Sequence, residues 1–468
     1  MQVAINIAQP GDTILLQAGA TFTGNFVLPV KTGASYITIR SSAPDSALPL
    51  STQRISPSYE SQLPKIQSGN GMQAMVTAPG AHHYRLLALE FLASFQGNGD
   101  ILDLGDGSSA QNTLASVPHD LIVDRVYIHG DVTYGQKRGI GLNSASTSVL
   151  NSYIADIKAV GMDSQAICGW NGPGPFTIVN NYLEAAGENV LFGGADPAIP
   201  NLVPSDITFT QNYLSKPLAW RTQNWTVKNL LELKNAQRVV IDGNILENVW
   251  PSGQTGYAVV ITPRNQGGTA PWSVVQQVQF TNNVVRHVSS VFQLLGTDDN
   301  FPSQQTNHIV VRNNLFDDVS SATFGGEGRW LLIMGSAQAT FDHNTVINDG
   351  ASTIMADVAQ ATGLVLTNNI MADNLWGIMG SNASPGNGTI AMYFPNIQIL
   401  DNVIAGSDPS IYPAGNYYPA TMGGVGFGGL GGGNYRLAST SIYRGAATDG
   451  TDIGCDITAL NAAAGTKY

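Results

Sequence analysis

The phrase Val179-Asn180-Asn181-Tyr182-Leu183 returns along this chain of 468 residues, for example as Thr210-Gln211-Asn212-Tyr213-Leu214 and Thr281-Asn282-Asn283-Val284-Val285. Its second Asn recurs at a mean spacing of about 32 residues, at Asn181, Asn212, Asn244, Asn283, Asn314, Asn344, Asn369 and Asn402. A strand of alternating apolar residues precedes each copy, and a further apolar strand follows at a distance. Strand, Asn turn, strand, loop and strand at this period predict one coil of a parallel β-solenoid per copy.

Asparagine suits such a bend for two reasons. It tolerates left-handed backbone angles, and Asn side chains stacked at one site per coil can form hydrogen bonds from coil to coil as a ladder. His343 occupies the position before the ladder Asn, which Asn282, Asn313 and Asn368 fill elsewhere, so we interpret it as a turn residue. A β-propeller is disfavoured because its blades need four strands and a longer repeat.

The composition excludes several classes of protein. Only 12% of the residues are charged, whereas 43% are hydrophobic, which disfavours coiled coils and disordered chains. A net charge of −12 argues against a nucleic-acid partner, which needs cations to neutralise phosphates. We find no apolar run long enough for a membrane span, and the two Cys form neither a disulfide framework nor a zinc site. Met1-Gln2-Val3-Ala4 does not begin a signal peptide, so none is expected within this sequence.

The repeat and the two ends of the chain resemble the right-handed parallel β-helix superfamily of the pectate lyases and related polysaccharide-degrading enzymes, with its secreted bacterial members. The segment 4–16, with its Pro10-Gly11-Asp12 turn, is similar to the usual start of such proteins, and 449–456 is similar to their final coil. The resemblance implies one all-β domain of about 10–12 coils. We expect a capping helix and first strands in 1–30, coils in 31–420 with loop insertions at 195–307, and a Gly-rich loop and closing segment in 421–468.

The insertions are rich in aromatic and basic residues. Loop aromatic rings that no core requires are suited to stack on sugars, and between 216 and 264 six cations outnumber three anions, which would attract an acidic glycan. The alternative is that the rings pack the loops onto the coils and that the charges are ordinary. The predicted substrate-binding residues are Trp220, Arg221, Trp225, Lys228, Trp250, Tyr257 and Trp272.

A lyase is the first hypothesis for the chemistry. In Leu231-Glu232-Leu233-Lys234 the alternation directs both Leu inward, so Glu232 and Lys234 share the outer face of one strand. Arg264 follows the strand of the next coil. β-Elimination on a uronate needs one group to neutralise the carboxylate and a base to take the C5 proton, and Lys234 and Arg264 are the candidates. The alternative is a plain salt bridge between Glu232 and Lys234.

A glycoside hydrolase with paired carboxylates is the second hypothesis. Asp298-Asp299 resembles the Asp-Asp pair of polygalacturonases, although the other motifs of that family are missing. Glu232 and Glu188 are the further candidate acids.

The sequence favours an extracellular enzyme that cleaves an acidic glycan, with a hydrolase second and a non-catalytic carbohydrate-binding or cell-surface β-helix third. We expect a polysaccharide partner, no nucleic acid, no membrane span, a monomer, and a secreted or cell-surface location. The resemblance implies a calcium ion as cofactor, but no cluster of Asp and Glu on successive coils matches the calcium site of pectate lyases, so no metal ligand is assigned.

Overall fold

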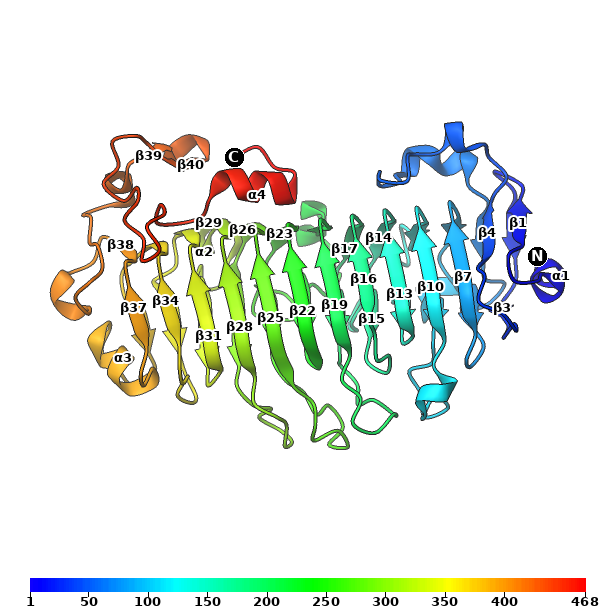
Figure 1. Cartoon of the computed structure of the whole chain (residues 1–468), viewed down its shortest axis with the longest axis horizontal. Helices are drawn as coiled ribbons and strands as arrows, with labels where there is room; N and C mark the ends of the chain where they lie inside the picture. Colours follow the sequence, from blue (N-terminus) through cyan, green and yellow to red (C-terminus); the bar gives the residue numbers. More distant parts are fainter. The chain divides into compact units, whose positions relative to one another are not determined.

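In the computed structural model, which describes residues 1–468, the coils contribute short strands to three all-parallel sheets (Figure 1). The chain divides into two compact units. The first comprises residues 1–237 and 265–273, and the second comprises 238–264 and 274–468. No helix is long and apolar enough to cross a membrane.

The first unit begins with helix α1 (Gln2–Ile7), which confirms the expected capping helix. Its first sheet has the order β1 (Thr13–Leu16), β4 (Ile37–Ser41), β7 (His82–Leu87), β10 (His119–Asp124), β13 (Ala145–Leu150), β16 (Phe176–Val179) and β19 (Ser205–Thr210). Its second sheet has β2 (Thr21–Thr23), β5 (Lys65–Gln67), β8 (Glu90–Phe91), β11 (Tyr127–His129), β14 (Tyr153–Ile157), β17 (Tyr182–Ala185) and β20 (Tyr213–Ser215). Its third sheet has β3 (Phe26–Leu28), β6 (Met75–Thr77), β9 (Asp100–Leu104), β12 (Arg138–Leu142), β15 (Gln165–Gly169), β18 (Glu188–Phe192) and β21 (Leu231–Leu233).

The second unit repeats this plan. Its first set of parallel strands comprises most of β22 (Ala236–Asp242), then β25 (Val275–Thr281), β28 (Asn307–Arg312), β31 (Ala337–Asp342), β34 (Val365–Thr367) and β37 (Gln398–Leu400). A second set is β23 (Ile245–Val249), β26 (Val284–Val288), β29 (Leu315–Val319), β32 (Thr345–Asn348), β35 (Ile370–Ala372) and β38 (Val403–Ala405). A third is β24 (Tyr257–Ile261), β27 (Ser290–Leu295), β30 (Leu331–Met334), β33 (Ser352–Ala356) and β36 (Gly377–Gly380). Helices α2 (Ser321–Phe324), α3 (Asn387–Tyr393) and α4 (Ile457–Ala464) lie outside the sheets.

The predicted asparagine ladder is present in both units. Asn181 donates from Nδ2 to Oδ1 of Asn212 at 3.0 Å in the first unit. In the second unit the same bond joins Asn314 to Asn344 at 3.0 Å and Asn344 to Asn369 at 2.9 Å. These side chains are buried, and each also donates to a main-chain carbonyl, as Asn314 does to Phe280 at 2.9 Å. The ladder therefore satisfies polar groups that the tight turn would leave unpaired.

The left-handed backbone angle belongs to the residue before the ladder Asn. Asn180, Gln211 and Asn313 have φ of 56°, 57° and 56°. His343 has φ of 51° in the same slot, which confirms that it is a turn residue. The two tasks that the sequence assigned to one Asn are thus divided between two neighbours. One residue bends the chain, and the next one forms the ladder.

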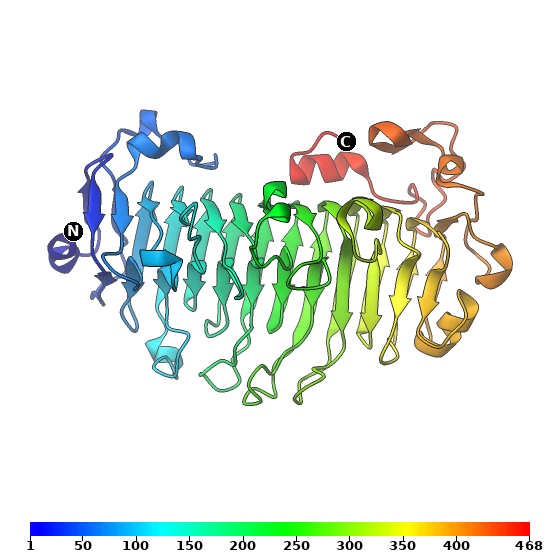
Figure 2. The ribbon, with the colours of Figure 1, turned by 180° about the vertical axis from the view of Figure 1, so that it is seen from behind.

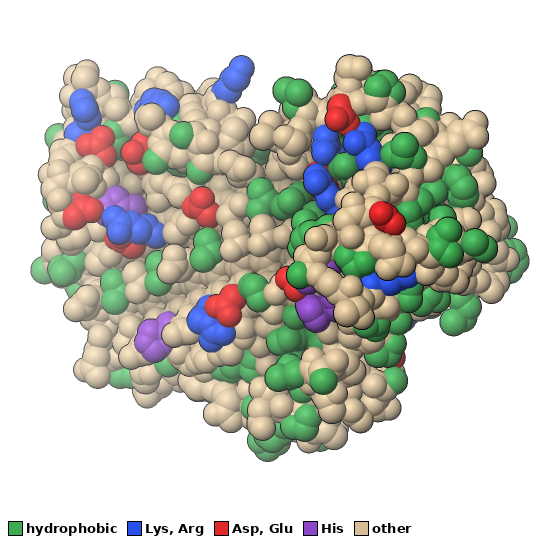
Figure 3. Space-filling view, turned by 45° about the vertical axis from the view of Figure 1, so that its right-hand side comes forward, with side chains coloured by type: hydrophobic (Ala, Val, Ile, Leu, Met, Phe, Trp, Pro, Cys, Tyr) green, Lys and Arg blue, Asp and Glu red, His purple; other side chains and the backbone are tan.

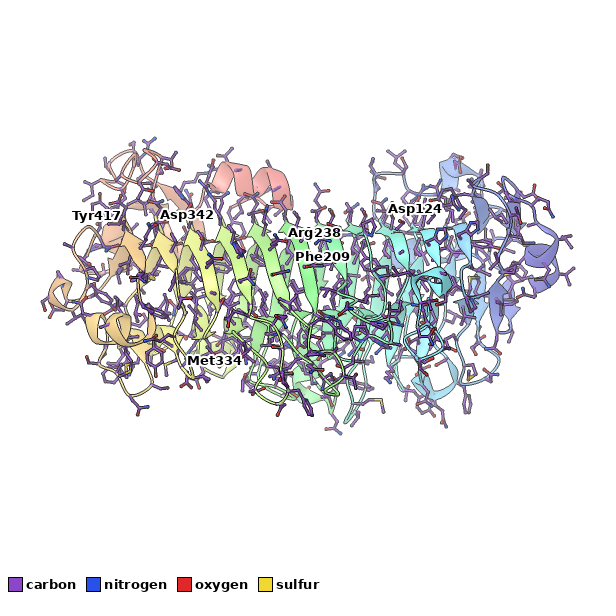
Figure 4. All side chains as sticks on the ribbon, turned by 60° about the horizontal axis from the view of Figure 1, so that its bottom comes forward. Asp124, Phe209, Arg238, Met334, Asp342 and Tyr417 are labelled. Carbon is purple, nitrogen blue, oxygen red and sulfur yellow. The ribbon has the colours of Figure 1, made fainter.

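A long arm covers these turns in the first unit. Residues 42–64, which include two short 3₁₀ turns (Asp45–Ala47 and Pro57–Gln62), leave the first coils and lie over the strand ends of later ones (Figure 2). Arg54 donates to the carbonyl oxygens of Asn180 at 3.0 Å and Gln211 at 3.1 Å. In Figure 4, Asp124 lies at the turn end of its strand, where it accepts a hydrogen bond from Asn151.

In the second unit the C-terminal segment covers the turns. Helix α4 packs Ile457 and Leu460 against Val284 and Leu315, above the ends of β26 and β29 (Figure 1). The expected Gly-rich loop instead contains two short strands, β39 (Phe427–Gly429) and β40 (Asn434–Leu437), which pair antiparallel. Asp342, labelled in Figure 4, ends β31 beside this segment and contacts His343.

Candidate functional site

A chain of charged and polar side chains crosses the outer face of the third sheet in the first unit. Strand register places Arg138 beside both Asp100 and Gln165, and Gln165 beside Glu188. Arg138 binds both carboxylate oxygens of Asp100 at 3.0 Å and donates to Oε1 of Gln165 at 3.1 Å. Gln165 in turn donates to Glu188 at 2.9 Å. Four neighbouring strands are therefore joined by one hydrogen-bonded row.

Lys228, which belongs to a loop insertion, lies next to Glu188 at the end of this row. Its Nζ lies 2.5 Å from Asp163 and 3.6 Å from Oε1 of Glu188. Burial lowers the pKa of Lys228, but Glu188 and Asp163 outweigh that effect and raise it above the ordinary value. Lys228 therefore stays a cation beside the fully buried Glu188.

Strand β21 places Glu232 and Lys234 next to this row. Leu231 and Leu233 are buried in the core, as the alternation predicts. Glu232 points outward but is only 2% exposed. Its Oε1 lies 3.4 Å from Nζ of Lys234, and its Oε2 accepts a hydrogen bond from Asn229 at 3.1 Å. Burial raises the pKa of Glu232 to about 7, although Lys234 opposes the shift. We call Glu188, Lys228, Glu232 and Lys234 the acid–lysine cluster.

The acid–lysine cluster does not match a calcium site. Oε1 of Glu188 and Oδ1 of Asn229 are buried and lack hydrogen-bond partners, which is where a cation would be sought. Calcium takes six to eight oxygen ligands, whereas two carboxylates and one amide are offered here. Two ammonium groups already lie within 3.6 Å of those carboxylates. No group of three or more His, Cys, Asp or Glu in the chain is arranged to hold a metal ion.

Asp103 lies at the far end of the row, and no sequence motif pointed to it. Burial, followed by the nearby Asp100, raises the pKa of Asp103 to about 8. The space for this pair depends on Gly141, because a Cβ there would lie 2.3 Å from Oδ1 of Asp103 and 2.7 Å from Oδ2 of Asp100. Asp100 is neutralised by Arg138, whereas Asp103 holds a proton at neutral pH.

Lys216 is a second residue that sequence reasoning missed. It is fully buried beneath the turn that leads into Glu188. Its Nζ donates to the carbonyl oxygens of Ala185 at 2.7 Å, Ala186 at 3.1 Å and Gly187 at 2.7 Å. Burial lowers the pKa of Lys216 to about 7. This lysine fixes the backbone from which Glu188 projects.

The predicted aromatic platform divides into buried and half-buried rings. Trp220 is 4% exposed, and its ring lies 5.5 Å from Nζ of Lys158. Trp225 is half-buried, and its ring lies 5.1 Å from the same ammonium. Trp272 is also half-buried and donates to the carbonyl oxygen of Leu202 at 2.9 Å. Trp220 thus packs an insertion onto the first unit, and sugar stacking stays a prediction for Trp225 and Trp272.

The remaining predicted binding residues have different environments. Arg221 is exposed in the short turn Leu218–Thr222 of the first unit. Trp250 and Tyr257 belong to the second unit and are 7% and 3% exposed. Burial raises the pKa of Tyr257 to about 12. Trp250 and Tyr257 of the predicted platform are therefore buried residues. The structure does not support a contact between either ring and a substrate.

Arg264, Asp298 and Asp299 form one ion-paired group in the second unit. Nη1 of Arg264 lies 2.7 Å from Oδ1 of Asp298 and also contacts Asp299. Burial lowers the pKa of Arg264, but the two carboxylates outweigh it and raise the pKa. Arg264 stays protonated and is unsuited to act as a base. The Asp-Asp pair thus shares one guanidinium, which balances one of its two negative charges.

Charge is sparse over the visible surface, where blue and red side chains stand in small groups among neutral ones (Figure 3). The acid–lysine cluster, with the row that leads to it, gathers several buried titratable groups on one face of the first unit. It combines a carboxyl that titrates near neutral pH with two ammonium groups. Such a set can transfer a proton and can neutralise an anion.

Comparisons with known proteins identify the fold. No family model matches the chain, and no curated protein is similar in sequence. Among solved structures, the chain is similar to the PL6 family alginate lyase AlyGC, with a TM-score of 0.54 and 14% identity over 89% of this chain. It is also similar to the catalytic unit of a thermostable GH87 α-1,3-glucanase from Streptomyces thermodiastaticus, with a TM-score of 0.53 and 13% identity over 90% of this chain. The chain spans 51% of the lyase and 65% of the glucanase unit. The fold is the right-handed parallel β-helix, as the sequence predicted.

Proposed function

We propose that this protein is a polysaccharide-degrading enzyme, and specifically a lyase that cleaves a uronate-containing glycan by β-elimination at the acid–lysine cluster. One observation carries the proposal: Glu232, with a pKa of about 7, lies 3.4 Å from the ammonium of Lys234 on the outer face of the third sheet. The similarity in fold to an alginate lyase and to a glucanase supports a carbohydrate polymer as substrate.

The raised pKa of Glu232 lets the pair exchange a proton near neutral pH. We assign the amine of Lys234 as the base, after it has passed a proton to the neighbouring carboxylate of Glu232. Lys234 is the more accessible partner, with 14% of its side chain exposed against 2% for Glu232. Lys234 is therefore the group that meets the substrate, and Glu232 is its proton partner.

The elimination then balances in charge and in protons. Lys228 neutralises the uronate carboxylate, which makes the C5 proton acidic. Lys234 takes that proton, the electrons of the C5–H bond form the C4–C5 double bond, and the bond from C4 to the glycosidic oxygen breaks. The leaving oxygen takes the proton of Glu232. The pair ends as an ion pair, and transfer of one proton from Lys234 back to Glu232 restores the starting state.

A hydrolase is the second candidate, and the pair Glu188 and Glu232 favours it. Both carboxyl groups are buried, yet Lys228 and Gln165 neutralise or hold Glu188, whereas the pKa of Glu232 is raised to about 7. Two carboxyls in different environments suit the base and the acid of glycoside hydrolysis. No step is assigned to calcium, because the donor set does not match that ion. Either activity on a polymer is consistent with a secreted or cell-surface location.

The assay incubates the protein with alginate, polygalacturonate, hyaluronan and neutral glucans, and follows near-ultraviolet absorbance of unsaturated uronate together with reducing ends. A lyase raises both signals, and a hydrolase raises reducing ends alone. Binding without either signal would contradict an enzyme. Lys234→Ala should lower kcat by about 100-fold or more, whereas Lys137→Ala, outside the cluster, serves as the matched control. Equal activity of Lys234→Ala and the control would remove Lys234 from the mechanism.

A further inference from the structure

A concave site lies on the first unit, at the turns that follow its second sheet. The cavity has a volume of about 640 Å³, which is within the range of small-molecule sites. Its walls come from four consecutive coils: Thr23, Gln67–Gly69, Leu92–Gln96, and His129–Asp131 with Tyr134. None of these residues belongs to the acid–lysine cluster or to the row that leads to it.

Two aromatic side chains at this cavity are exposed to solvent. Phe95 is 65% exposed and Tyr134 is 62% exposed. Most large apolar side chains of the coils are buried instead, so these two rings contribute little to the core. An exposed ring beside a polar cavity can stack on the C–H face of a sugar, since it is apolar on its faces and keeps polar neighbours at its edge.

The backbone that carries both rings is tightly held. Asp131 and Gly135 form an antiparallel bridge, and Oδ1 of Asp131 accepts hydrogen bonds from the amides of Thr133 at 2.7 Å and Tyr134 at 2.8 Å. Gly97 touches this tip so closely that a Cβ there would lie 2.5 Å from the carbonyl oxygen of Gly135. The site is therefore formed before any ligand arrives, which lowers the entropic cost of binding.

The charges at the cavity select against acidic ligands. Its lining contains no Lys and no Arg, and its one carboxylate is that of Asp131. His129 is directed to Oε1 of Glu90 at 3.1 Å. The amides of Gln67 and Gln96 offer donors and acceptors of the kind that sugar hydroxyls require, whereas the hydroxyl of Ser68 is already bonded to Asn25 and Asn70. A uronate or sulfate would find no cation here.

We propose that this cavity binds neutral sugar units of an oligosaccharide, with Phe95 and Tyr134 as stacking rings. The site goes beyond the proposed catalytic function, because it uses other residues and selects uncharged sugars. It would hold a neutral glycan, or a neutral stretch of a mixed polymer, on the first unit.

The test is calorimetric titration with neutral hexasaccharides of β-1,4-glucose, α-1,4-glucose, β-1,4-mannose and β-1,4-galactose, and with hexauronates. Wild type should bind at least one neutral hexasaccharide saturably and more tightly than any hexauronate. Phe95→Ala and Tyr134→Ala should each weaken that binding by about fivefold. Phe301→Ala, which removes an exposed Phe of the second unit, should leave it unchanged. Thermal melting should show that all three variants stay folded, because the side chains are exposed.

The proposal is overturned if no neutral hexasaccharide binds, if hexauronates bind more tightly, or if the affinity of Phe95→Ala and Tyr134→Ala equals that of wild type. Lys234→Ala separates this site from the proposed activity, since it should keep the neutral-sugar affinity. Absence of lyase or hydrolase activity with intact binding would reject the proposed function alone.

Discussion

The Nζ of Lys216 donates a hydrogen bond to Oδ1 of Asn189, 2.8 Å away, where solvent reaches neither side chain. The three carbonyl bonds of Lys216 complete its surroundings, so one ammonium serves four oxygen acceptors. A neutral amine has too few donors for this arrangement, and the contacts therefore favour the charged form. Lys216 replaces, in effect, the water or ion that a tight buried turn usually needs.

Lys216→Met should destabilise the protein by about 3 kcal/mol or more, because it leaves buried acceptors without donors. Chemical denaturation monitored by circular dichroism measures the change in the free energy of unfolding. Lys467→Met, at an exposed lysine, is the control and should change little. A destabilisation no greater than that of the control would contradict the structural role of Lys216.

Glu232→Gln tests the proton transfer. The elimination needs the pair to hold one proton rather than two, and the second proton is lost as Glu232 ionises with a pKa of about 7, so the rate should rise as the pH rises through that value. Gln cannot release a proton, so the variant should lose most activity and also lose this limb of the pH–rate profile. A variant that keeps the same limb would show that another group titrates. The measurement is kcat between pH 5 and pH 9.

Asp103 should make stability depend on pH in a defined direction. Its folded pKa of about 8 lies above the unfolded value of about 4. The stabilisation is present below about pH 4 and is lost as the pH rises through about 8, because the folded state must then ionise a buried carboxyl. Asp103→Asn stays neutral, so its Tm should decline less than that of wild type between pH 5 and pH 9. Asp106→Asn, at an exposed carboxylate, should follow wild type.

Asn314→Ala interrupts the ladder of the second unit. Asn314 donates to Phe280 and Asn344 and accepts from Asn283, so the change leaves several buried groups unpaired. We expect a loss of about 2–4 kcal/mol in the free energy of unfolding. Asn300→Ala, at an exposed loop position, provides the comparison, and equal stability of both variants would show that the ladder is not needed.

The sequence predicted the structural features that recur in every coil. A ladder Asn such as Asn314 is needed at the same turn of every coil, so its regular spacing could be recognised from the sequence alone. The residue before each ladder Asn, such as His343, could be identified as a turn residue from its position in the repeat alone. Outward and inward directions on β21 followed from strand alternation, and Glu232 and Lys234 do form an ion pair.

The candidate site was only partly predictable because its contacts join different coils and insertions. Asp100 and Arg138 are 38 residues apart, and their pairing depends on the length of every intervening loop. In the sequence Lys216 resembles an ordinary loop lysine, because the residues adjacent to it do not indicate that its ammonium group will bind main-chain carbonyl oxygens. The sequence left open whether Trp220 and Trp250 bind sugars or pack the insertions onto the coils, because composition does not show whether an insertion folds back on the coils.

The arm of residues 42–64 has a consequence for the evolution of the first unit. Arg54 contacts turns that lie 126 and 157 residues further along the chain. The reach of the arm is fixed, while the distance to those turns grows with every coil inserted between them. Duplication or loss of a coil in this stretch would carry Asn180 and Gln211 out of register with Arg54. The arm therefore ties the number of coils between Arg54 and Gln211 to its own reach, whereas it does not limit the coils that follow Gln211.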